Sequence, residues 1–190
     1  MSRHMWTKIS SVLILCAALP VAAYAADGSF NYNYANGGYV SESPSGGSSL
    51  NGLGVDGSYT FTPNWHAFAG YSHLTCCSIS ENNFNLGAGY HMDLSNQLGL
   101  FVEGEFLRFN ATGTSANGWG VDGGVRFAIN SQFEVDGFVS HTNVNTNPSS
   151  TENTIGVRGL FNINQQWSVF ASYSNNSDFN TFQAGVRFYY

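Results

Sequence analysis

The stretch Phe182-Gln183-Ala184-Gly185-Val186-Arg187-Phe188-Tyr189-Tyr190 closes the chain. Apolar residues alternate along it with polar, small or amphipathic ones at a period of two. This is the pattern of a β-strand that has one face in an apolar environment. One face carries Phe182, Ala184, Val186, Phe188 and Tyr190, and the other carries Gln183, Gly185, Arg187 and Tyr189. A single strand of this kind needs partners, so we expect the same pattern elsewhere in the chain.

The alternation recurs from about residue 29 onward, and no segment shows the 3.6-residue period of an amphipathic helix. The sequence therefore predicts an all-β fold of repeated antiparallel hairpins. We place ten strands, and a count of eight is the alternative. The ten segments are 29–40, 51–62, 65–74, 82–92, 97–109, 117–129, 133–143, 153–163, 167–175 and 181–190.

Composition excludes several classes of protein. The chain has 190 residues, of which 9% are charged and 15% are aromatic. Disordered chains have many charges and few aromatic residues, so this chain should fold. Ordinary soluble domains carry about 25% charged residues, which makes a cytosolic enzyme an unusual match. No run of 18 apolar residues follows the N-terminal segment, so we expect no transmembrane helix in the mature chain.

Residues 1–25 have the three parts of a secretory signal peptide. Arg3 and Lys8 supply the basic part, 9–22 the apolar part, and Ala23-Tyr24-Ala25 the cleavage site. A lipoprotein signal ending at Cys16 is the alternative. Cleavage leaves residues 26–190 as the mature domain, with four arginines, no lysine and twelve acids. Its net charge near −8 excludes a nucleic-acid-binding surface, which needs basic patches.

The position of the charges favours a barrel in a membrane over a soluble sheet. When each strand is given an outward apolar face, nearly all strand charges fall on the other face, and only Arg108 falls on the apolar one. A charge facing lipid at mid-bilayer costs about 2–4 kcal/mol, so a transmembrane barrel requires this pattern. The sequence predicts a transmembrane antiparallel up-and-down β-barrel. Its lumen network would be Asp56, Glu103, Glu105, Asp122, Arg126, Glu134, Asp136, Arg158 and Arg187.

Aromatic residues at strand starts support the membrane assignment. Trp65, Phe133 and Trp167 each follow a short turn, where the girdle at a membrane interface belongs, and we assign Trp119 to the girdle as well. Short turns then face the periplasm and longer loops face outside. The longer connections would be 41–49, 75–81, 110–116, 144–152 and 175–180.

Two resemblances to known proteins support the same architecture. The C-terminal Gln183, Gly185, Phe188 and Tyr190 resemble the signal that the barrel-assembly machinery reads in bacterial outer-membrane proteins. The opening 29–40, the 64–71 hairpin and Gly156-Val157-Arg158-Gly159 resemble small outer-membrane barrels of xanthomonad-type bacteria, once discussed as activators of plant immunity and as quorum-sensing-associated proteins. More loosely, the chain is similar to barrels of the OmpA and OmpX type. These resemblances imply a place in the bacterial outer membrane and its vesicles.

The lumen residues allow two functional interpretations. Arg126 should lie opposite Asp136, with Glu134 as a diagonal neighbour, so an internal ion-pair plug is our first expectation. Six lumen acids against three arginines would also suit a narrow cation-preferring passage. We predict a non-enzymatic barrel with a structural or surface-interaction role, such as envelope integrity or adhesion, and keep the channel as the alternative. A barrel enzyme is the third and weakest alternative.

Chemistry-bearing motifs add little to this. His66 and His91 should point inward near the periplasmic end, and no sequence neighbour supplies them with an acid. We therefore predict no catalytic residue and no metal site. We also predict no cofactor, because the two matches to the dinucleotide pattern G-x-G-x-x-G, at 52–57 and 118–123, lie inside predicted strands and not between a strand and a helix. The expected partners are outer-membrane lipid, lipopolysaccharide and the barrel-assembly machinery, with a host-surface partner left open. Neither the oligomeric state nor the redox state of Cys76 and Cys77 follows from the sequence.

Overall fold

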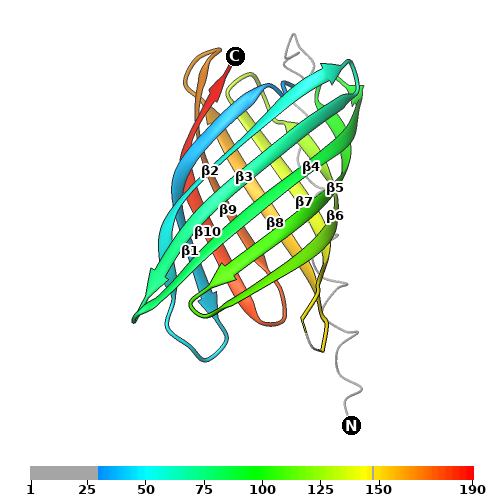
Figure 1. Ribbon diagram of the computed structural model, residues 1–190. Helices are drawn as coiled ribbons and strands as arrows, with labels where there is room; N and C mark the ends of the chain where they lie inside the picture. The colour runs from blue at the N-terminus through cyan, green and yellow to red at the C-terminus, as the bar shows by residue number, and fades with distance from the viewer. Residues whose placement is uncertain (1–29, 147) are drawn as a thin grey trace, which may run out of the picture.

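A computed structural model describes residues 30–146 and 148–190 as a closed antiparallel barrel of ten strands (Figure 1). The predicted all-β barrel is confirmed, and its count is ten rather than eight. The signal peptide predicted at 1–25 lies outside the described residues. The strands are β1 (Tyr34–Pro44), β2 (Leu50–Thr62), β3 (Trp65–Cys76), β4 (Ile79–Ser95), β5 (Leu98–Ala111), β6 (Thr114–Ala128), β7 (Phe133–Val144), β8 (Ser150–Asn162), β9 (Trp167–Asn175) and β10 (Phe179–Tyr189).

Each strand pairs with its neighbours in the sequence, and β1 pairs with β10 to close the barrel. Closure satisfies the backbone groups of every strand edge, which is required wherever lipid surrounds the sheet. Within the described residues, no helix has both the length and the apolar character needed to cross a membrane.

The two ends of the barrel carry different connections. We call the end with residues 63–64, 96–97, 129–132 and 163–166 the turn end; it also holds the C-terminus and is uppermost in Figure 1. The loop end carries residues 45–49, 77–78, 112–113, 145–149 and 176–178. The connections at the two ends therefore differ in length less than the sequence predicted, because the strands extend into segments that the sequence assigned to loops.

Two of the expected loops are two-residue turns. Cys77 and Ser78 both have positive φ, and Gly113 has a φ of 83°. Two-residue hairpin turns require such conformations, which Asn-Gly or Asp-Gly pairs usually supply. The Cys77-Ser78 pair lacks that signature, so a tight turn could not be predicted there.

The outward face of the barrel is apolar along its whole circumference. Thirty large hydrophobic side chains are exposed among the described residues, including Leu53, Val102, Val121, Val139 and Val157. A soluble domain rarely exposes so much contiguous apolar surface, whereas lipid-facing strands require it. The inward face holds glycines, polar residues and the strand charges other than Arg108, together with apolar side chains such as Leu74 and Phe170.

Residues 30–33 correct the predicted first strand. The sequence placed a strand at 29–40, but β1 begins at Tyr34 and continues to Pro44. The alternation of Phe30 and Tyr32 continues that of β1, yet these residues precede the sheet. Both side chains pack against the buried guanidinium of Arg126, so their burial comes from packing inside the lumen.

Glycine is required where the barrel closes. Gly38 of β1 lies opposite Gly185 of β10. A Cβ at Gly185 would lie 2.3 Å from the carbonyl oxygen of Gly37, and one at Gly38 would lie 2.4 Å from that of Ala184. Side chains cannot fit at these contacts, so the pair lets the first and last strands approach closely inside the lumen.

Candidate functional site: a buried layer and a cavity in the lumen

Tyr32 fills the lumen near the turn end. Its side chain is 5% exposed, and its ring stacks on those of His91 and His66 at centroid distances of 3.8 and 4.7 Å. The two histidines come from β4 and β3, and their Nδ1 atoms lie 3.0 Å apart, which is a hydrogen bond that needs one proton between them. The N-terminal segment is therefore fixed to the barrel wall by side chains from two strands.

Arg126 of β6 holds the same segment from the other side. Its guanidinium lies 4.5 Å from the ring centroid of Tyr32 and 4.9 Å from that of Phe30. Its Nε donates to Glu134 Oε1 at 2.7 Å, and Asp136 Oδ1 lies 3.7 Å away. Arg126 faces Asp136 directly across β6 and β7, as predicted, but it bonds more closely to the diagonal Glu134.

A second group of buried side chains adjoins this one. Arg187 is 1% exposed, and its guanidinium lies 3.9 Å from the ring centroid of Tyr34. Its Nε donates to Asn36 Oδ1 at 2.8 Å, and its Nη1 donates to the Tyr189 hydroxyl at 3.4 Å. Together the two groups form what we call the sealing layer: Phe30, Tyr32, Tyr34, His66, His91, Arg126, Glu134, Asp136, Arg187 and Tyr189.

Glu103 links the layer to the rest of the lumen. His66 is 1% exposed, and its Nε2 lies 2.8 Å from Glu103 Oε1. The sequence predicted inward positions for His66 and His91 but no acid beside them. Glu103 lies 37 residues away along the chain, so only the pairing of β3 with β4 and of β4 with β5 brings it to His66.

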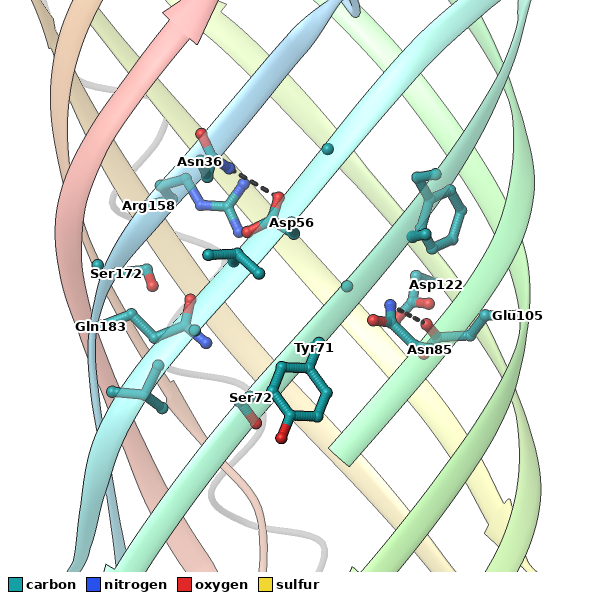
Figure 2. A pocket seen from close by; sticks show the side chains of 18 of the residues that line it. Asn36, Asp56, Tyr71, Ser72, Asn85, Glu105, Asp122, Arg158, Ser172 and Gln183 are labelled. Atoms are coloured by element: carbon teal, nitrogen blue, oxygen red, sulfur yellow. Dashed lines mark hydrogen bonds between the residues drawn. The ribbon is translucent and has the colours of Figure 1, made fainter. Parts of the chain in front are cut away.

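A polar cavity of about 420 Å³ occupies the lumen on the loop side of the sealing layer. Figure 2 shows the side chains around it: Arg158, Ser172 and Gln183 lie on one side, and Asn85, Glu105 and Asp122 lie on the other. Asp56 also lines it and accepts a hydrogen bond from Asn36 at 2.8 Å. Three further acids of the inward face, Glu42, Glu81 and Glu152, lie beyond it near the loop end.

The structure brings only some of the predicted lumen charges into ion pairs. Within residues 30–146 and 148–190, ion pairs join Arg126 to Glu134 and Asp136, and His66 to Glu103 when that histidine is protonated. Five predicted members of the network make no ion pair within 4.0 Å in the same residues: Asp56, Glu105, Asp122, Arg158 and Arg187.

Aromatic residues mark both ends of the apolar face. Trp65, Phe133 and Trp167 begin β3, β7 and β9 at the turn end, and each packs against an aromatic residue of the next strand at 4.9 to 5.3 Å. Trp119 differs, because it lies in the half of β6 nearer the loop end.

Three tyrosines at the loop end were not identified from the sequence. The hydroxyls of Tyr39, Tyr71 and Tyr173 donate to asparagines on neighbouring strands at 2.5 to 2.8 Å. Amphipathic rings with a bonded polar tip belong at a membrane interface, so these tyrosines form a second girdle. The sequence signal that could have identified them is a tyrosine on one strand of a hairpin and an asparagine on the other strand.

The side chains of the C-terminal strand have separate positions. Gln183 lines the cavity, Gly185 makes the closing contact with β1, Phe188 packs on Trp167 at 4.9 Å, and the Tyr190 hydroxyl donates to the Ser58 carbonyl oxygen at 2.9 Å. Each of these residues thus has a structural contact of its own in the folded barrel.

A closed ten-stranded barrel with an apolar outer face, two aromatic girdles and a polar interior defines an outer-membrane β-barrel protein. Residues 11–158 match the family described as "Outer membrane protein beta-barrel domain", and the chain belongs to that family. No curated protein matches the chain.

Several solved structures are similar to this chain. The KdgM porin has a TM-score of 0.50 and 12% identity, and the match covers 82% of this chain and 99% of that one. Neisserial surface protein A has a TM-score of 0.48 and 15% identity, covering 83% of this chain and 96% of that one. The translocator domain of the autotransporter NalP from Neisseria meningitidis has a TM-score of 0.47 and 12% identity, covering 87% and 91%. At these identities the likeness concerns the fold alone.

Proposed function

We propose that this protein is a non-enzymatic outer-membrane barrel with a structural or surface-interaction role, and that its lumen is closed to ions. The sealing layer carries this proposal. Its members come from residues 30–33 and from six strands, and Tyr32, His66, Arg126 and Arg187 in it are nearly inaccessible to water. An ion would have to displace stacked rings and a paired guanidinium to pass.

The layer also gives the barrel rigidity. Arg126 is buried, hydrogen-bonded to Glu134 and ion-paired with Asp136. Removing either side of such an ion pair strongly destabilises a protein, because a buried charge is then left without a partner. Such an interior suits a protein whose barrel is a stable support for its outer surface. The turn end would face the periplasm and the loop end the exterior, and the resemblance to xanthomonad-type barrels supports a presence in shed vesicles.

A narrow cation channel is the second candidate. The observation that favours it is the excess of acids on the loop side, where Asp56, Glu105 and Asp122 have no cationic partner within 4.0 Å among the described residues. Such a surface attracts cations and repels anions. In this candidate the sealing layer would have to open.

Single-channel conductance of the refolded mature chain in planar bilayers separates the two candidates. Insertion is checked first by the change in gel migration on boiling that folded barrels show. We expect inserted protein to give no current. Reproducible cation-selective steps that become smaller in Glu105→Gln would overturn the closed-lumen proposal in favour of the channel.

The surface role has its own test. Residues 45–49 and 145–149 are the two longest connections at the loop end, and their replacement by Gly-Ser segments should leave the barrel folded. We expect the replacement to abolish an envelope or adhesion phenotype of the deletion strain that the intact gene restores. Full restoration by the loop-replaced gene would exclude a role for these loops.

A further inference from the structure

The cavity has two walls of opposite charge. Arg158 lies on β8 and Arg187 on β10, whereas Glu105 lies on β5 and Asp122 on β6. In the closed order of ten strands, β10 is five places from β5 and faces it across the lumen, whereas β8 is three places from β5 and two from β6. Figure 2 shows Arg158 and Glu105 on opposite sides of the cavity.

The basic wall has donors without acceptors. The Nε of Arg158 and one terminal nitrogen of Arg187 are buried and make no hydrogen bond within the described residues. No carboxylate oxygen of those residues lies within 4.0 Å of either guanidinium. Arg158 is paired in register with Ser172, and Ser172 with Gln183, so a hydroxyl and an amide lie on the same wall. The Arg158 guanidinium itself lies 5.8 Å from the ring centroid of Phe170. Buried unpaired donors of this kind are costly unless something bonds to them.

The acidic wall has the complementary deficiency. Glu105 Oε2 accepts one hydrogen bond, from Asn85 Nδ2 at 2.8 Å. Neither Glu105 nor Asp122 has a cation within 4.0 Å in the described part of the chain. Glu103 is the third carboxylate on this wall and already bonds to His66. Glu105 and Asp122 therefore have capacity to accept hydrogen bonds from an ammonium group.

We propose that this cavity binds a small zwitterion, with its carboxylate on Arg158 and its ammonium group on Glu105 and Asp122. A guanidinium recognises a planar carboxylate with two parallel hydrogen bonds, and two carboxylates are a fitting site for an ammonium group. The charges of the ligand must lie at its opposite ends, because Arg158 lies on one side of the cavity and Glu105 and Asp122 lie on the other (Figure 2). A cavity of about 420 Å³ is within the range of small-molecule sites and has room for a dipeptide.

The two walls exclude simpler ligands. A plain cation would leave the buried Arg158 nitrogen unbonded, and a plain anion would lie opposite two carboxylates. Asp56 lies near Arg158 in Figure 2, but it is bonded to Asn36 and makes no ion pair with the guanidinium. Only a ligand with both charges bonds to both walls.

Calorimetric titration of the refolded mature chain in detergent with L-alanyl-L-alanine tests the proposal. Two capped forms serve as matched probes: the N-acetyl dipeptide lacks the ammonium group, and the dipeptide amide lacks the carboxylate. We expect saturable binding of the free dipeptide and a loss of about tenfold or more for each capped form, since a charge-assisted hydrogen bond contributes about that factor.

Variants connect each charge to its wall. In Arg158→Gln we expect the dipeptide to bind about tenfold more weakly and the amide cap to make no further difference. In Glu105→Gln we expect the N-acetyl dipeptide to bind as strongly as the free dipeptide does, because a carboxylate partner of the ammonium group is gone. Arg108→Gln on the outer face and Glu152→Gln near the loop end are matched substitutions outside the cavity and should bind as the parent does.

The proposal is overturned if a large excess of dipeptide gives no binding heat, or if the capped forms bind as well as the free one. It is also overturned if Arg158→Gln, shown to be folded by its gel shift, retains full affinity and full sensitivity to the amide cap. Binding in detergent does not depend on conductance, so the closed-lumen proposal and this one can fail separately.

Discussion

At the scale of single residues, Arg126 and Tyr32 hold together parts of the barrel that are distant in the sequence. Arg126 pairs with Glu134 and Asp136, and Tyr32 stacks on His66 and His91. A hairpin register is enough to predict Arg126 opposite Asp136. The packing of Tyr32 could not be predicted, because it depends on the order and stagger of strands from three parts of the chain.

Arg126 should contribute strongly to stability. Replacing it in Arg126→Gln leaves Glu134 and Asp136 buried without a cation, so we expect a loss of about 3–5 kcal/mol in the free energy of unfolding. Urea unfolding in lipid vesicles measures it. Arg108→Gln is the control, since Arg108 is exposed and makes a long hydrogen bond of 3.4 Å to Asn117. Equal effects of the two substitutions would contradict a buried ion-pair role for Arg126.

The closing glycine contact gives a second measurable difference. A Cβ at Gly185 meets backbone atoms at 2.3 and 2.7 Å, whereas one at Gly159 has no heavy atom within 4 Å. We expect Gly185→Ala to destabilise the barrel by about 1–3 kcal/mol and Gly159→Ala to change stability by less than about 0.5 kcal/mol. The same vesicle-based unfolding compares them, and an unaffected Gly185→Ala would show that the contact can relax.

At the scale of strands, alternation predicts how many strands there are more reliably than where each strand ends. Period-two alternation is strong in the lipid-facing region, because each outward residue there must be apolar. It weakens near the loop end, where strands leave the membrane and Ser, Asn and Thr are acceptable on both faces. The segments 75–81 and 110–116 therefore read as loops, although they are strand ends joined by two-residue turns.

The apolar face should tolerate charge only near its edge. Val157 lies on the outward face in the middle of β8, and Thr151 lies on the same face close to the loop end. We expect Val157→Arg to lower the unfolding free energy by about 2–4 kcal/mol and Thr151→Arg by about 0–1 kcal/mol. A similar, small effect at both positions would argue against lipid contact at mid-strand.

The turn at Cys77 can report which end of the barrel faces outward. Cys77 is exposed at the loop end, and it and Cys76 are free cysteines. After mild reduction of intact cells, we expect a membrane-impermeant maleimide to label the protein and Cys76→Ser, but not the Cys76→Ser/Cys77→Ser variant. Labelling that occurs only after the outer membrane is broken would place the loop end in the periplasm.

At the scale of the whole molecule, the barrel is an all-β shell with a layer of buried side chains near the turn end. The shell follows from the composition, the alternation and the positions of the charges, so the sequence was sufficient to predict it. The layer does not, because residues 30–33 continue the strand pattern and yet contribute Phe30 and Tyr32 to the packing around Arg126. Our closed-lumen proposal rests on these side chains.

Potassium efflux from proteoliposomes compares the intact mature chain with Phe30→Ala/Tyr32→Ala, at equal amounts of protein shown to be folded. Removing the two rings opens space beside Arg126 without removing a charge. We expect vesicles with the parent protein to retain potassium and those with the variant to release it quickly. Equal release by both, or equal retention by both, would contradict the claim that this N-terminal segment seals the barrel.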